Sequence, residues 1–104
     1  MDRMTMLKEM LKEDEKDSFL QHALALEYIK RGNDEEARRL FETLLNHDPA
    51  YIGSYYHLGK LLERTGLPGK AMRIYKKGME MAKSVNDSHS YNELQGALED
   101  AEDE

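Results

Sequence analysis

Apolar residues recur along this chain at intervals of three and four. Residues with this spacing share one face of an α-helix, because the helix completes a turn every 3.6 residues. Two rows of this kind are present, Leu20, Leu24 and Tyr28 in the first and Tyr55, Leu58 and Leu62 in the second. Both rows are predicted to be amphipathic helices that pack on a common core.

The chain also repeats itself after 34 residues. The segment EARRLFETLLNHDP, residues 36–49, is echoed by KAMRIYKKGMEMAK, residues 70–83. The shift places Tyr75 on Phe41, so an aromatic residue holds the same position in both copies. Such a period indicates similar helical units that stack on one continuous core.

Start and stop signals divide each copy into two helices. Ser18 followed by Gln21 predicts a capping box that opens the first helix, and Gly32 can supply the left-handed residue that closes it. Asn33 with Glu36 opens the next helix. Asp48 followed by Pro49 ends that helix and starts a third, Gly66 ends the third helix, and Pro68 lies where a fourth begins. The sequence therefore predicts a helix–turn–helix unit, twice.

Small residues are found where the two helices of a unit must approach closely. They are Ala25 and Gly59 on the first helices and Ala37 and Ala71 on the second. Phe41 and Tyr75 are expected to fill the space beside them. A single hairpin of this kind cannot bury its apolar stripe, so neighbouring hairpins must stack.

These residues resemble the tetratricopeptide repeat, in which a large residue, Leu, a small residue and Tyr are followed by Ala, an aromatic residue and Pro. The first copy matches with Gln21, Leu24, Ala25, Tyr28, Ala37, Phe41 and Pro49. The second copy matches with Tyr55, Leu58, Gly59, Leu62, Ala71 and Tyr75. Gln21 replaces the usual aromatic residue, and Lys83 replaces the Pro. The resemblance covers residues 18–85 and implies an all-α fold, a right-handed α-solenoid of antiparallel helix pairs.

Single helices are predicted to flank the two copies as caps. Under the same shift Leu7 falls on Phe41, which makes the amino-terminal helix half of a repeat. We therefore expect one tetratricopeptide-like domain over residues 1–104. Its parts are a half-repeat helix at 3–14, repeat 1 at 18–51, repeat 2 at 52–85, a carboxy-terminal capping helix at 87–100 and an acidic tail at 101–104.

Composition narrows the class of protein further. The chain has no cysteine, which excludes disulfides, thiolate zinc sites and cysteine nucleophiles. Its longest apolar-rich segment, HALALEYI, is far shorter than the roughly 20 residues that span a bilayer. Residues 1–17 carry charges throughout and do not have the pattern of a secretory signal. The expectation is a cytoplasmic protein that does not enter a membrane.

The sequence offers no arrangement of residues for catalysis. It has no Gly-rich phosphate loop, no Gly-x-Ser-x-Gly elbow and no His-Glu-x-x-His pair. Its four histidines form no local ligand pair; they are His22, His47, His57 and His89. We therefore expect a protein that is not an enzyme, with no catalytic residue, no metal ligand and no cofactor.

The resemblance also implies that the first helix of each pair lines a concave groove. The residues at those places are Phe19, His22, Leu26, Ile29, Tyr56, His57, Lys60, Glu63 and Asn92, with His89 as a further candidate. The implied function is a non-catalytic protein–protein interaction adaptor that binds a peptide segment in this groove. Phe19, Leu26 and Ile29 would supply apolar contact, Tyr56 an aromatic wall and Lys60 a charge anchor. The alternative is that the apolar members pack against the terminal helices.

One known function of the family is a clamp of Lys, Asn and Arg side chains that holds the acidic tails of chaperones. The matching places here hold His22, Leu26, His57, and then either Asp87 and Tyr91 or His89 and Glu93. Neither register supplies the cations that a carboxylate requires. We therefore expect no carboxylate-clamp binding of chaperone tails.

The net charge of −6 conceals an asymmetry. Residues 52–85 contain seven basic and two acidic side chains, whereas residues 86–104 contain seven acidic side chains and no Lys or Arg. A basic helix face is predicted from Lys70, Arg73, Lys76, Lys77 and Lys83. This face could bind nucleic acid, but no aromatic residue is interleaved with it. That favours a solvated face partly neutralised by residues 87–104.

The amino-terminal helix lacks one neighbour that the stacking pattern requires. Its apolar residues, which the following helix cannot all cover, are Met4, Leu7, Met10 and Leu11. They are candidates for a homodimer surface, in which case the chain would be a structural subunit that self-associates. Fraying of this helix is the other interpretation.

Overall fold

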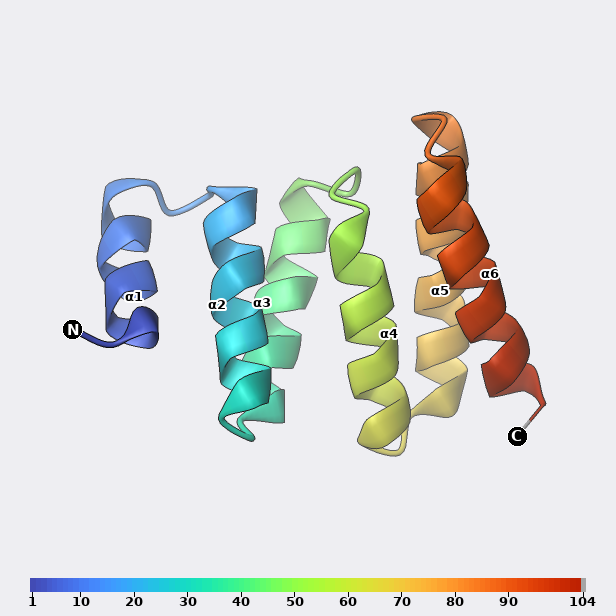
Figure 1. Cartoon of the computed structure of the whole chain (residues 1–104), viewed down its shortest axis with the longest axis horizontal. Coiled ribbons are helices and arrows are strands. Elements are labelled where there is room, and N and C mark those ends of the chain that lie inside the picture. Colours follow the sequence, from blue (N-terminus) through green and yellow to red (C-terminus); the bar gives the residue numbers. More distant parts are fainter. Residues whose placement is uncertain (104) are drawn as a thin grey trace. The chain divides into compact units, whose positions relative to one another are not determined.

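The computed structural model describes residues 1–103, which form six α-helices and no strand (Figure 1). The helices are α1 (Arg3–Glu13), α2 (Ser18–Lys30), α3 (Asp34–His47), α4 (Gly53–Arg64), α5 (Pro68–Ser84) and α6 (Ser88–Glu102). The predicted all-α fold of antiparallel helix pairs is confirmed. The chain divides into two compact units: unit 1 is Met1–Asp48, with α1 to α3, and unit 2 is Pro49–Glu104, with α4 to α6.

In unit 1, α2 and α3 form an antiparallel hairpin, and α1 packs against α2. The hairpin shields four of its residues completely from solvent, namely Ala25, Ala37, Phe41 and Leu44. Leu7 of α1 joins Leu20, Ala23 and Leu24 of α2 in one buried apolar cluster. The amino-terminal helix is therefore part of the core of its unit.

In unit 2, α4 and α5 form the second hairpin, and α6 packs against both helices. The largest buried apolar side chains of this unit are Tyr55, Leu58, Leu61, Leu62, Tyr75 and Leu94. Burial of each such side chain contributes on the order of 1.5–3 kcal/mol. The row of apolar residues that predicted the first helix of this unit, Tyr55, Leu58 and Leu62, is therefore also part of its core.

The two hairpins differ in how large and small side chains share the space where their helices meet. Gly59 lies under the ring of Tyr75, and a Cβ atom at Gly59 would come within 2.1 Å of that ring. Gly78 lies against Tyr55, where a Cβ atom would come within 2.7 Å of the tyrosine. The equivalent positions of unit 1 hold Ala25, Phe41, Leu44 and Gln21, in the same order. Each unit therefore fills the same helix contacts with a different division of volume.

Three turns close with the same backbone pattern. Gly32, Gly66 and Asn86 have left-handed φ angles of 77°, 84° and 58°. The residue after each one donates its N–H to a carbonyl five residues back, as Asn33 does to Tyr28 at 2.8 Å. The two glycines confirm the predicted stop signals. Asn86 was not predicted, although asparagine tolerates this backbone region better than most residues do.

The predicted capping box at the start of α2 is wrong. Asp17 is the N-cap residue, and its carboxylate accepts the N–H of Leu20 at 2.9 Å. The hydroxyl of Ser18, one residue later, donates instead to the carboxylate of Asp48. Asn33 does occupy the N-cap of α3, but without a capping bond from its side chain.

Gln21, which stands where the repeat usually has an aromatic residue, makes the same hydrogen bond as its counterpart in unit 2. Its side-chain amide is buried and donates to the carbonyl of Glu15 at 3.0 Å. Tyr55, 34 residues later, donates its hydroxyl to the carbonyl of Pro49 at 2.6 Å. The amide oxygen of Gln21 lies 2.7 Å from Nε2 of His47, which must donate because that oxygen can only accept.

The last helix is longer than the sequence indicated. α6 continues to Glu102, whereas the prediction placed an acidic tail at 101–104. Ala101, which the prediction placed in the tail, belongs to α6 and is buried. Glu104, the last residue of the predicted tail, lies outside the described residues.

Candidate functional site

Within unit 2, a pocket of about 260 Å³ lies between α4 and α6. Its apolar lining comes from Ile52, Tyr56 and Leu94, and its polar lining comes from His57, Ser90 and Glu93. Two of the predicted groove residues, Tyr56 and His57, therefore meet here. Ile52 and Ser90 were not singled out from the sequence, and Glu93 was considered only as a position where the clamp fails.

His57 contributes a neutral imidazole to this pocket at physiological pH. The side chain is half-buried, and burial lowers its pKa, which the nearby carboxylate of Glu93 only partly offsets. The ring also meets the ring of Tyr56 edge-on, with 5.9 Å between the two centroids. The wall formed by these two rings is therefore aromatic and uncharged.

Lys60 lies one turn beyond Tyr56 on the same face of α4. Its ammonium is 5.6 Å from the centroid of the Tyr56 ring and 3.8 Å from the carboxylate of Glu63. The predicted charge anchor is thus paired within its own helix. Any ligand that uses Lys60 must compete with the Glu63 carboxylate.

Glu63 is a poor groove residue, which corrects the prediction. Its side chain is only 17% exposed, and it accepts a hydrogen bond from the hydroxyl of Tyr75 on α5. Burial raises the pKa of Tyr75 well above its usual value, and this hydrogen bond raises it further. Glu63 therefore joins α4 to α5 inside the hairpin.

Asn92 lies apart from the pocket between α4 and α6. It is exposed and lines a separate cavity of about 270 Å³ with Lys83 and Tyr91. His89 is also exposed, and its Nε2 lies 3.5 Å from the carboxylate of Glu93, an ion pair only when the histidine is protonated. Neither of these predicted residues lines the pocket.

The groove candidates of unit 1 differ in how they meet solvent. Phe19, at the start of α2, is 63% exposed. Leu26 and Ile29 are half-buried, and His22 is held edge-on against the Phe41 ring with 5.8 Å between centroids. Among these candidates Phe19 alone presents a largely exposed apolar side chain.

Comparison with known proteins decides the family. A family model described as "Tetratricopeptide repeat" matches residues 52–84. The solution structure of a tetratricopeptide repeat domain protein from Salinibacter ruber is 43% identical to this chain, with a TM-score of 0.82. That match covers 86% of this chain and 90% of the other. This chain belongs to the tetratricopeptide-repeat family.

Further comparisons agree on the repeat. A crystal structure of a tetratricopeptide repeat domain protein from Salinibacter ruber is also 43% identical, covering 83% of this chain and 97% of that one with a TM-score of 0.79. A protein from Bordetella parapertussis is 25% identical, covering 97% of this chain and 88% of that one with a TM-score of 0.83. A search of curated proteins gave no significant match. Tetratricopeptide repeats generally mediate protein–protein interactions, and proteins of the family are generally non-catalytic.

The predicted dimer surface of this tetratricopeptide-repeat chain needs correction at Leu7. This side chain is only 5% exposed, because it packs into the cluster on α2. Met4 and Leu11 are half-buried against the same cluster, which leaves Met10, at 50% exposed, as the one open member of the set. The following helix therefore covers more of α1 than the sequence indicated.

Charged side chains also tie α1 to α2. The carboxylate of Glu27 lies 3.7 Å from the guanidinium groups of both Arg3 and Arg31. Arg31 in turn lies 3.8 Å from the carboxylate of Asp2. The ammonium of Lys8 is 5.6 Å from the centroid of the Tyr28 ring. These contacts join the start of α1 to the end of α2 and oppose fraying.

The basic face of α5 is exposed along its length, and its residues are Lys70, Arg73, Lys76, Lys77 and Lys83. Lys77 pairs with Glu80 on the same helix at 4.0 Å. Within residues 1–103 no ion pair joins this face to α6, so any neutralisation by residues 87–103 acts without direct contact. Exposure is compatible with both interpretations, a solvated face and a surface for nucleic acid, so both stay predictions.

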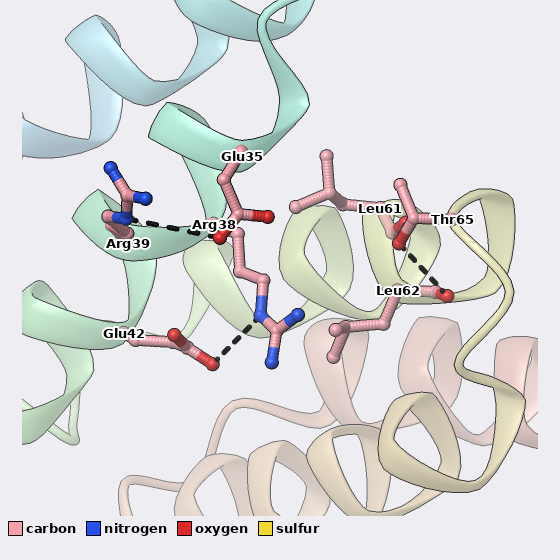
Figure 2. Close-up of polar contacts among 7 residues, drawn as sticks. All are labelled: Glu35, Arg38, Arg39, Glu42, Leu61, Leu62 and Thr65. Carbon is pink, nitrogen blue, oxygen red and sulfur yellow. Dashed lines mark hydrogen bonds and ion pairs between the residues drawn. The ribbon is translucent and has the colours of Figure 1, made fainter.

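The surface of α3 compensates its own charges. Figure 2 shows Arg39 beside Glu35, at 3.9 Å, and Arg38 beside Glu42, at 3.3 Å. The same figure shows Thr65, at the end of α4, whose hydroxyl donates to the carbonyls of Leu61 and Leu62, at 2.9 and 3.4 Å. Exposed pairs of this kind contribute little energy and mark no site.

Two further functions find no support in the described part of the chain. Residues 1–103 contain no group of three His, Cys, Asp or Glu side chains placed to hold a metal ion. None of the helices in this range combines the length and the apolar content that crossing a bilayer requires. The pocket between α4 and α6 is the candidate site because two of the sequence-predicted groove residues, Tyr56 and His57, line it together.

Proposed function

We propose that this chain is a non-catalytic adaptor that binds a peptide segment of a partner protein, with the pocket between α4 and α6 receiving one side chain of that peptide. The observation that carries the proposal is the exposed ring of Tyr56 at a pocket of about 260 Å³ with apolar and polar lining. Pockets that enclose a whole small-molecule ligand usually exceed about 300 Å³. A single anchoring side chain suits this volume better.

Tyr56 has the properties of an energetic anchor. Aromatic residues at protein interfaces bury a large area with few rotatable bonds, and they dominate binding energy when they line a pocket. In unit 1, the exposed Phe19 offers a second aromatic contact of its own. Both residues lie on first helices, where the resemblance placed the binding face.

The test is selection from a random peptide library displayed on phage, followed by affinity measurements on the peptides recovered. We expect peptides with dissociation constants of about 1 μM, typical of a small interface. Tyr56→Ala should weaken them by about tenfold or more, the effect of losing an interface anchor. Tyr91→Ala, which removes a tyrosine from α6 outside the pocket, should leave affinity unchanged.

Circular dichroism must show that both variants keep the helical content of the wild type. If no peptide is enriched above the bare support, the adaptor proposal fails. If peptides are enriched but bind Tyr56→Ala and wild type equally, the pocket has been placed wrongly.

A further inference from the structure

The pocket between α4 and α6 can take the apolar stem of a long side chain. Ile52 and Leu94 supply aliphatic surface, and the Tyr56 ring supplies a flat face that is 36% exposed. Long basic side chains bury their methylene groups against such surfaces and keep the charged head at the edge. The guanidinium of arginine also stacks on aromatic rings.

Glu93 places a negative charge at this pocket. Its side chain is 56% exposed, and within residues 1–103 its one ion-pair partner is His89, which is charged only when protonated. His57, the other titratable group in the lining, is favoured in its neutral form by burial. At neutral pH the Glu93 charge is therefore open to a cation from outside.

The segment that carries Glu93 is negatively charged as a whole. Residues 86–104 contain seven acidic side chains and no Lys or Arg. The ammonium of Lys60 lies 5.6 Å from the centroid of the Tyr56 ring, and the Glu63 carboxylate at 3.8 Å compensates its charge. A basic ligand would thus be attracted to this part of unit 2, and an acidic one would be repelled.

We infer that the side chain received by this pocket is basic, arginine above all, and that it belongs to a peptide segment of a partner protein. Its stem would lie against Ile52 and Tyr56, and its guanidinium would pair with the Glu93 carboxylate. This inference rests on the proposed function and names the chemistry of the partner. It is the opposite of a carboxylate clamp, which selects acidic peptides.

The occupant is a separate peptide rather than a second copy of this chain. The chain's own basic face, on α5, presents its side chains from a rigid helix, and Lys77 is already paired with Glu80. A pocket of about 260 Å³ suits one flexible side chain better than a row of lysines on a helix. Surface ion pairs between two copies would also be individually weak.

The experiment uses the peptides selected on wild type and a charge reversal at Glu93. We expect Arg or Lys to be enriched at one position of the selected peptides, and Glu93→Lys to weaken their binding by about tenfold or more. A peptide in which that basic residue is replaced by Glu should bind Glu93→Lys more tightly than wild type. Glu99→Lys makes the same change in charge on α6 outside the pocket and should alter affinity less than about threefold.

The outcomes separate this inference from the proposed function. Peptides that depend on Tyr56 but carry no enriched basic residue would overturn the inference and leave the adaptor proposal standing. An affinity that is insensitive to Glu93→Lys would do the same. Sedimentation that shows the wild-type chain associating with itself, and Glu93→Lys not doing so, would assign the pocket to a second copy and overturn the choice of occupant.

Discussion

At the residue scale, His57 links the pocket to pH. Burial lowers its pKa from the ordinary value of 6.5, so the unfolded chain binds a proton there more readily than the folded chain does. The contribution of the buried, neutral His57 to the free energy of unfolding is therefore present above about pH 6.5. It is lost as the pH falls through the lowered pKa. His57→Gln removes the titrating group.

We expect urea unfolding to show the wild type losing stability between about pH 7 and pH 5, and His57→Gln losing less. The Glu93 carboxylate opposes the lowering of the His57 pKa. In a chain that keeps His57, Glu93→Gln should therefore steepen the loss of stability as the pH falls. In a chain that carries His57→Gln, the same change at Glu93 should not have this effect. Equal pH dependence in wild type and His57→Gln would show that burial of His57 is not coupled to folding.

At the element scale, the α4–α5 hairpin depends on the absence of a side chain at Gly59. A Cβ atom there would lie 2.1 Å from Cε1 of Tyr75, so Gly59→Ala must displace a fully buried ring. Overpacking of this kind costs about 1–3 kcal/mol. Urea unfolding should register that loss as a lower free energy of unfolding.

Gly96 provides a matched control within unit 2. It is an exposed glycine in α6, and a Cβ atom there would meet nothing within 4 Å. Gly96→Ala should stabilise the chain by about 0.5–1 kcal/mol, because alanine gives up less backbone entropy in a helix. Gains of similar size at both positions would mean that helix propensity, rather than the Tyr75 contact, governs the response.

The elements were predicted from local signals, and the errors arose where two local signals compete. Gly32 and Gly66 were predicted correctly because a glycine that follows a helical row commonly adopts the left-handed conformation that ends the helix. Asp17 and Ser18 are both good N-cap residues, and the choice between them depends on Asp48, which is distant in sequence. Leu7 was misplaced for a related reason, since the face that α1 turns to α2 depends on tertiary packing.

The candidate site was predicted only in part, because it depends on contact between α4 and α6. Tyr56 and His57 follow from the position of a first helix in the repeat. Glu93 and Ser90 line the same pocket because the turn at Asn86 brings α6 back against α4. The position of this turn does not follow the 34-residue period. No pattern within α6 alone shows that Glu93 faces His57.

At the scale of the whole molecule, membership of the tetratricopeptide-repeat family makes protein–protein interaction the general class of activity. We propose in addition that the partner is contacted at the pocket between α4 and α6. The test is to titrate the isotope-labelled chain with a selected peptide and to follow the backbone amide signals by NMR. We expect the largest shifts on Ile52, Tyr56, His57 and Glu93, whereas shifts confined to the basic face of α5, or to unit 1, would contradict the proposal.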